Sequence, residues 1–336
     1  PMTISRDHKN VAVLATCQSL FATGQAVLII LSGLVGAAIA ENKALATLPV
    51  STVVIATMLT TIPASLLMKR IGRRAGFMIG ALIGACGAAL SVYAIYLANF
   101  WLFSFATLVI GMYGGFAQYY RFAAADVAEE HFKSRAISWV ISGGIIAAFA
   151  GPELARKTYD MFAGALFLGS YIAVAVLAVA AIGFLAMLDI PLPDIAERHQ
   201  TGRPLNVIIK QSSLIVAITV AMIGYGVMGL LMTATPLAMT GYGFNIGDVT
   251  LVIQWHVLAM FGPAFVTGAI IHRFGALWVM LSGTVLLAFA VATALEGVEI
   301  TNYWLALSAL GMGWNFTFVA ASSLLTETYE PAERAK

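Results

Sequence analysis

The chain has 336 residues, of which 60% are hydrophobic and only 10% are charged, and its formal net charge is +2. Because soluble globular domains carry about 25% charged residues, this composition excludes an ordinary water-soluble protein. No basic stripe is interleaved with aromatic residues, which argues against a nucleic-acid-binding surface. We therefore expect a membrane protein that is surrounded by the lipid bilayer and has no nucleic-acid partner.

Ten apolar segments are long enough to cross a membrane. A bilayer core of about 30 Å requires roughly 20 residues of helix, since a helix rises about 1.5 Å per residue. The segments are Val11–Ala40, Leu48–Leu67, Gly76–Ala98, Trp101–Phe122, Ile137–Pro152, Phe162–Leu188, Leu214–Met239, Val249–Ile271, Leu277–Leu295 and Tyr303–Leu325. The sequence therefore predicts an all-α polytopic membrane protein with ten spans.

Lysine and arginine residues gather on one side of the membrane if these spans alternate in direction. Three of them, Lys43, Arg156 and Lys157, fall on the opposite side. The fourteen on the first side are Arg6, Lys9, Lys69, Arg70, Arg73, Arg74, Lys133, Arg135, Arg198, Arg203, Lys210, Arg273, Arg334 and Lys336. Short loops rich in these residues stay on the cytoplasmic side, so we expect the N-terminus to be cytoplasmic.

Two loops of the first half of the chain recur in the second half. The segment Lys69–Gly76 is similar to Ile271–Leu277, and Ala128–Ala136 is similar to Tyr329–Lys336, each about 200 residues later. A polar stretch with Pro193 lies between the two copies. We therefore predict an N-terminal six-helix half over residues 1–190, a cytoplasmic linker over 191–210 and a C-terminal half over 211–336.

This organisation resembles the major facilitator superfamily, whose two six-helix halves each carry a basic, glycine-containing loop between their second and third helices. The chain departs from the family at Lys69, where that loop usually has an acidic residue. The resemblance implies a major facilitator fold in a bacterial inner membrane. Because the second half shows four spans, we expect the last two helices to be absent from this chain, with a ten-helix protein as the alternative.

Methionine and histidine side chains are paired in the seventh and eighth spans. Met228 and Met232 share one helical face, and so do His256 and Met260, because residues four apart are neighbours on a helix. Counted from the loop that joins the two spans, Met232 and His256 lie roughly 11–12 Å deep, and Met228 and Met260 roughly 17–18 Å deep. Thioether and imidazole ligands suit Cu(I), so we predict a metal site made of these four residues.

Each pair alone has an ordinary structural explanation. The chain contains 14 methionines, and methionine often fills irregular apolar gaps. A single buried histidine such as His256 can also be a hydrogen-bonded core residue or a proton carrier. The metal interpretation depends on the equal depth of the two pairs on consecutive spans.

At these four positions the chain resembles the CcoA-type copper importers, a bacterial branch of the superfamily with a Met-x-x-x-Met in the seventh span and a His-x-x-x-Met in the eighth. The resemblance implies import of copper, as Cu(I), by alternating access, and supply of copper for the assembly of cbb3-type cytochrome oxidase. Copper would be the transported substrate, with no resident cofactor. A periplasmic copper donor and a cytoplasmic copper acceptor are partners that the sequence does not identify.

The two cysteines, Cys17 and Cys86, are too few for a disulfide framework, and buried cysteines usually behave as hydrophobic residues. A role in relaying copper is the alternative for either of them.

Uptake of a small organic solute such as riboflavin is the alternative function. Aromatic and amide side chains that could serve it are Gln25, Gln118, Tyr119, Tyr120, Arg121, Trp314 and Asn315. A proton-coupled drug exporter would need a carboxylate deep in a span, and the sequence shows none. We do not expect an enzyme, because no nucleophile and base, phosphate loop or zinc spacing occurs in a polar segment.

Overall fold

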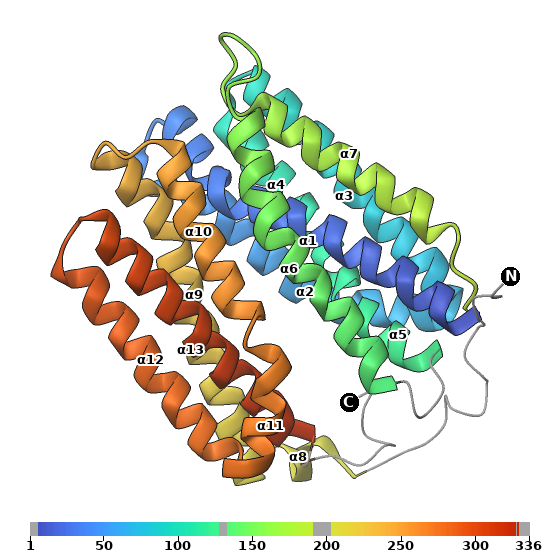
Figure 1. The fold of residues 1–336 in the computed structure, drawn as a ribbon. Helices are drawn as coiled ribbons and strands as arrows, with labels where there is room; N and C mark the ends of the chain where they lie inside the picture. The colour runs from blue at the N-terminus through green and yellow to red at the C-terminus, as the bar shows by residue number, and fades with distance from the viewer. Residues whose placement is uncertain (1–5, 128–132, 191–202, 327, 329–336) are drawn as a thin grey trace, which may run out of the picture. The chain divides into compact units, whose positions relative to one another are not determined.

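The computed structural model describes residues 6–127, 133–190, 203–326 and 328. Within these residues the structure is helical and has no strand (Figure 1). The helices are α1 (Arg6–Ile39), η1 (Lys43–Leu45), α2 (Leu48–Ile71), α3 (Arg73–Tyr96), α4 (Phe100–Ala117), α5 (Tyr120–Val127), α6 (Lys133–Thr158), α7 (Leu168–Leu185), α8 (Leu205–Ile208), α9 (Ser212–Gly241), α10 (Ile246–Phe261), α11 (Ala264–Phe274), α12 (Ala276–Glu296) and α13 (Ile300–Thr326). The predicted all-α class is confirmed.

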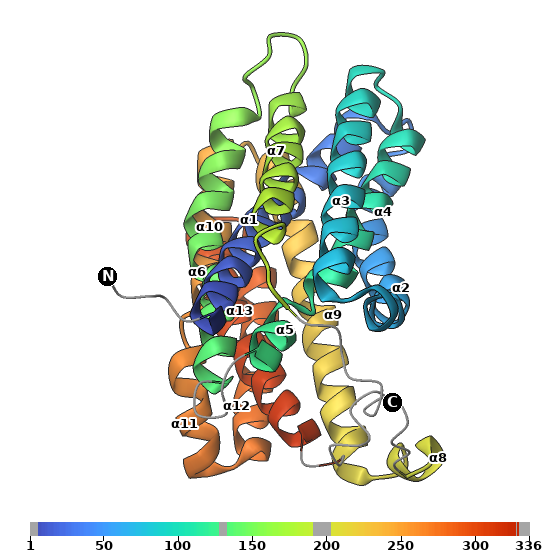
Figure 2. The same cartoon turned by 90° about the vertical axis from the view of Figure 1, so that its right-hand side faces the viewer.

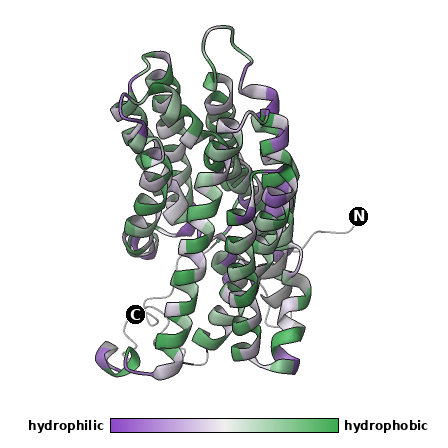
Figure 3. Cartoon of the chain, turned by 90° about the vertical axis from the view of Figure 1, so that its left-hand side faces the viewer, coloured by the Kyte–Doolittle hydropathy of each residue, from purple (hydrophilic) through white to green (hydrophobic). Residues whose placement is uncertain are grey.

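Every predicted span contains helix. In the described part of the chain, eight helices are long and apolar enough to cross a membrane, or nine if the bent pair α10 and α11 is counted as one span. The remaining predicted span corresponds to α6, which has 26 residues. Large apolar side chains such as Met222, Leu230 and Trp278 are each 69% exposed, and apolar residues predominate along the long helices (Figure 3). Lipid accommodates such surfaces, so this is a multi-pass membrane protein.

The helices form two compact units. One comprises Pro1–Pro193 with Pro236–Thr250, and the other comprises Asp194–Thr235 with Leu251–Lys336. Residues 191–202 of the predicted linker lie outside the described residues, as do 128–132 and 329–336 of the second predicted repeat. The predicted boundaries of the two halves stay a prediction.

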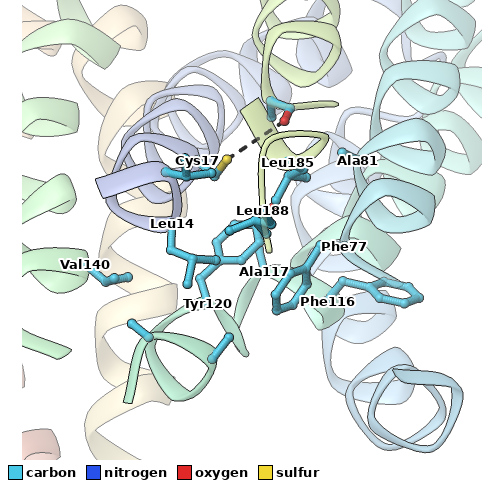
Figure 4. Packing of buried hydrophobic residues seen from close by; sticks show 14 of the residues in the cluster. Leu14, Cys17, Phe77, Ala81, Phe116, Ala117, Tyr120, Val140, Leu185 and Leu188 are labelled. Atoms are coloured by element: carbon cyan, nitrogen blue, oxygen red, sulfur yellow. Dashed lines mark hydrogen bonds between the residues drawn. The ribbon is translucent and has the colours of Figure 1, made fainter. Parts of the chain in front are cut away.

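In the first unit, α1 packs against α6 and α7, while α3 packs against α4 and α7 (Figure 2). The core between them includes Leu14 and Cys17 of α1, Phe77 of α3, Tyr120 of α5 and Leu185 of α7, all of them fully buried (Figure 4). Because lipid tails are as apolar as these side chains, close van der Waals packing stabilises such a core more than the hydrophobic effect does.

The glycines of the repeated basic loop have the same backbone conformation. Gly72, between α2 and α3, has φ 88° and ψ 159°, and Gly275, between α11 and α12, has φ 84° and ψ 151°. Each donates its N–H to the carbonyl four residues earlier, at 2.9 Å for Gly72 and 2.8 Å for Gly275. Residues with a side chain rarely adopt this conformation, which explains why glycine stands at both positions.

Two spans that the sequence predicts as continuous are interrupted. Helix α4 ends at Ala117 and is followed by α5, and the predicted span Val249–Ile271 is broken between α10 and α11 with a bend of 42°. In the second case the reason is Pro263, which has no N–H to donate into the helix.

Candidate functional site

Helices α10 and α13 of the second unit approach each other so closely that their backbones nearly touch. A Cβ atom placed on Gly311 of α13 would lie 2.4 Å from the carbonyl oxygen of His256 and 2.9 Å from the amide nitrogen of Met260. One turn earlier on α13, the carbonyl oxygen of Leu307 lies 2.8 Å from Nδ1 of His256. The small residue at position 311 therefore allows this hydrogen bond to form.

An aromatic cluster joins α9 to the same face of α13. The rings of Trp314 and Phe318 stack at a centroid separation of 4.7 Å and an angle of 10°. Tyr225 of α9 meets them edge-on, at 5.6 Å from Trp314 and 5.7 Å from Phe318. Leu307, Gly311, Trp314 and Phe318 follow one another at helical spacing, so one side of α13 carries both the α9 and the α10 contacts.

The four residues predicted as metal ligands all lie in the second unit. Met228 and Met232 follow Tyr225 on α9 at three and seven residues, which places them on the face that contacts α13. Met232 is 5% exposed and His256 is fully buried. His256 and Met260 of α10 both lie at the contact with Gly311. Their role as metal ligands stays a prediction.

Asn315 holds the junction between α10 and α11. Its Nδ2 donates to the carbonyl oxygen of Met260 at 2.8 Å, and its Oδ1 accepts from the hydroxyl of Thr267 at 2.6 Å. The amide therefore links α13 to both sides of the break between α10 and α11. In this conformation both ends of the Asn315 amide have protein partners.

Three buried polar atoms of this region have no hydrogen-bond partner within the described residues. They are Nε2 of His256, Oγ of Ser308 and Nε1 of Trp314. Folded proteins pair the great majority of their buried polar atoms, so unpaired ones mark positions where a ligand or water completes the bonding. The three side chains offer hydrogen bonds beside an aromatic cluster.

The first unit contains a small, mainly apolar pocket of its own. Phe21 and Gln25 of α1 and Tyr113 of α4 contribute to its lining. Tyr120 is fully buried in the core, with its hydroxyl 3.1 Å from that of Tyr113. Tyr119 donates to the carbonyl oxygen of Thr61 at 3.0 Å.

The guanidinium of Arg121 lies over the ring of Phe122 at 4.9 Å. Cys17 is buried, with Sγ 3.8 Å from the carbonyl oxygen of Ala181, whereas Cys86 is exposed. These contacts place Arg121 and Cys17 in the helical framework of the first unit.

Tyr225, Ser308 and Gly311 were not singled out from the sequence. The spacing of Leu307, Gly311 and Trp314 does mark one face of a helix, but only the structure shows which helices meet on it. A glycine between larger residues on one helical face is the sequence signal that indicates such a close approach.

Comparison with known proteins identifies the family of this chain and relatives whose function is named. Residues 13–336 match the Major Facilitator Superfamily. The riboflavin transporter RfnT of Brucella anthropi is 42% identical over 331 residues, which cover 98% of this chain and 83% of that protein. The xylose transporter XylE from E. coli has a TM-score of 0.70 at 15% identity, covering 96% of this chain and 89% of its own. The nucleoside transporter NupG has a TM-score of 0.67 at 13% identity, covering 99% and 85%. At such low identity these structures show the fold alone.

The predicted copper import is wrong, and the resemblance to CcoA-type importers is not supported. A relative with 42% identity over nearly the whole chain is a riboflavin transporter, which favours the alternative of a small organic solute. Copper as the substrate was the basis for three further predictions. These were a copper donor, a copper acceptor and a role in cytochrome oxidase assembly, and they are likewise not supported. The physical reason is that methionines at helical spacing are equally suited to line an apolar surface.

The superfamily match over residues 13–336, the helical structure and the transporter relatives agree with one another, and the chain belongs to the Major Facilitator Superfamily.

Proposed function

We propose that this chain takes up riboflavin, or a flavin-like solute, across the bacterial inner membrane by alternating access, with its N-terminus in the cytoplasm. The observation that carries the proposal is its 42% identity, over 98% of the chain, to a riboflavin transporter. Superfamily members bind substrate near the middle of the membrane, where polar side chains inside spans serve function.

The chemistry of the second unit supports a flat, aromatic substrate with hydrogen-bonding edges. The Trp314, Phe318 and Tyr225 cluster offers ring faces and edges of the kind that aromatic ligands prefer. His256 and Trp314 each contribute a buried polar atom that has no hydrogen-bond partner among the residues that the structure describes. The levels of Leu307 and Trp314 on α13 are separated by about 10 Å at 1.5 Å per residue, which is comparable to the length of the three fused rings of a flavin.

In this proposal the flavin site has an adaptable apolar lining, which is formed by Met228, Met232 and Met260. Methionine is unbranched and polarizable, and its sulfur makes favourable contacts with aromatic rings. Replacing Met228 and Met232 together by leucine conserves volume but removes both thioethers. We expect flavin uptake to be retained to within about threefold in this variant, because volume-conserving apolar substitutions cost little.

The test is accumulation of radiolabelled riboflavin in a bacterial strain that can neither make nor import it, with the empty vector as background. We expect accumulation above background that excess unlabelled riboflavin suppresses. Copper content of the same cells serves as a control and should equal that of the vector strain. Riboflavin accumulation equal to the vector background, with the protein present in the membrane, would refute the proposed function.

A further inference from the structure

His256 is held in one tautomer by its contact with α13. Its Nδ1 lies 2.8 Å from the carbonyl oxygen of Leu307, and a carbonyl oxygen can only accept a hydrogen bond. Nδ1 therefore carries a hydrogen and donates it. In the neutral imidazole the other nitrogen, Nε2, then has no hydrogen and can only accept.

The acceptor at Nε2 lacks a donor in this conformation. The His256 side chain is fully buried, and Nε2 has no partner within the described residues. A buried acceptor without a donor is costly, because it has lost its bonds to water and gained none in return. A substrate that supplies an N–H at this position would recover that cost on binding.

Ser308 places a second unpaired polar atom at the same level of α13. It follows Leu307, the residue that fixes the histidine tautomer, and its Oγ is buried with no hydrogen-bond partner in the described part of the chain. A hydroxyl can donate as well as accept. At this level the site thus offers an obligate acceptor and a hydroxyl that can donate.

We propose that Nε2 of His256 accepts a hydrogen bond from the imide N3–H of the flavin ring, and thereby selects substrates that carry an unsubstituted imide. This inference rests on the proposed function and names the chemical group that its site would recognise. The imide is the group of the ring system that joins one N–H donor to two flanking carbonyl acceptors, which matches an acceptor at His256 and a donor at Ser308. The ribityl hydroxyls are the other donors of riboflavin, and a methyl group on N3 leaves them untouched.

The experiment compares the binding of riboflavin and of 3-methylriboflavin to the purified full chain in lipid nanodiscs, followed by quenching of flavin fluorescence. We expect 3-methylriboflavin to bind at least about tenfold more weakly, because the methyl group removes the donor and leaves the buried acceptor unpaired. Equal affinity for the two compounds would overturn the role of His256 and leave the proposed function standing. If riboflavin itself does not bind, both the inference and the proposed function fail.

The variant His256→Asn separates recognition from folding. The asparagine amide can keep a donor close to the position of Nδ1, facing the carbonyl oxygen of Leu307, but has no atom at the position of Nε2. We expect riboflavin to bind this variant about tenfold more weakly and 3-methylriboflavin to bind it as it binds the wild type. The matched variant Ser308→Ala removes the hydroxyl and should weaken both compounds equally. A His256→Asn protein that still prefers riboflavin tenfold would overturn the inference, and if this variant does not fold, the wild-type ratio decides alone.

Discussion

Asp189 is bound by two side chains of α1 in very different surroundings. Asn10 is 1% exposed and makes two hydrogen bonds to its backbone, donating to the carbonyl oxygen at 2.8 Å and accepting from the amide at 2.9 Å. Arg6 forms an ion pair with its carboxylate at 2.7 Å, but these side chains are 56% and 64% exposed. Exposed ion pairs contribute little, whereas loss of Asn10 would remove two part-buried hydrogen bonds to the backbone, so the neutral contact is expected to dominate.

We therefore expect Asn10→Ala to lower the free energy of unfolding by about 1–3 kcal/mol, and Arg6→Ala to lower it by less than about 1 kcal/mol. The chain has two cysteines, so a Cys86→Ser background leaves buried Cys17 as the single thiol. A thiol-reactive dye added during heating then reports the opening of the first unit. Equal shifts in melting temperature for the two variants would contradict the argument.

At the scale of helices, the contact between α10 and α13 depends on the missing side chain of Gly311. A Cβ atom added at Gly311 would lie 2.4 Å from a backbone oxygen of α10. The helices would therefore have to separate to accommodate even an alanine. By contrast, no heavy atom lies within 4 Å of the corresponding position on Gly226 of α9. Separation of the helices would also lengthen the bond between His256 and Leu307, which orients the histidine.

Gly311→Ala is expected to reduce flavin uptake at least tenfold and to lower the melting temperature. Gly226→Ala should retain uptake to within about twofold, because alanine is favoured over glycine by about 1 kcal/mol in helices and finds open space there. Both are measured as initial uptake rates at matched amounts of protein in the membrane. Similar rates for Gly311→Ala and the wild type would show that the two helices do not need this close contact.

At the scale of the whole molecule, the bilayer makes the helices predictable, since it imposes a length of roughly 20 apolar residues on each span. Ten such segments locate helices, and the repeated basic loop locates the turns at Gly72 and Gly275. The break between α10 and α11 could be anticipated from Pro263, but the hydrogen bond from Asn315 of another helix that stabilises it could not.

The proposed substrate was less predictable than the fold. Met228 and Met232 present the same sequence pattern whether their thioethers bind a metal or pack against an aromatic ring. The features that favour an organic solute, such as the stacked Trp314 and Phe318 and the fixed tautomer of His256, arise from contacts between helices. Sequence spacing describes one helix at a time, so it does not reveal them.

The charges of the loops predict how the molecule is oriented in the membrane. Fourteen lysine and arginine residues would lie on the cytoplasmic side and three on the other. Two of those three, Arg156 and Lys157, are paired with Glu153 at 2.8 Å and 3.0 Å, so their positive charges are partly compensated. Loops rich in lysine and arginine are not readily translocated across the membrane. We therefore expect the N-terminus to be in the cytoplasm.

Single cysteines at two exposed positions test this orientation without changing the number of positive charges. In a Cys86→Ser background, Glu41→Cys lies in the loop after α1 and Ala75→Cys lies at the start of α3, while Cys17 stays buried. A membrane-impermeant maleimide should label Glu41→Cys in intact spheroplasts, and should label Ala75→Cys only after the membrane is opened. The reverse pattern would place the N-terminus outside. Labelling of both positions in intact cells would mean that the positive loops do not hold the chain in a single orientation.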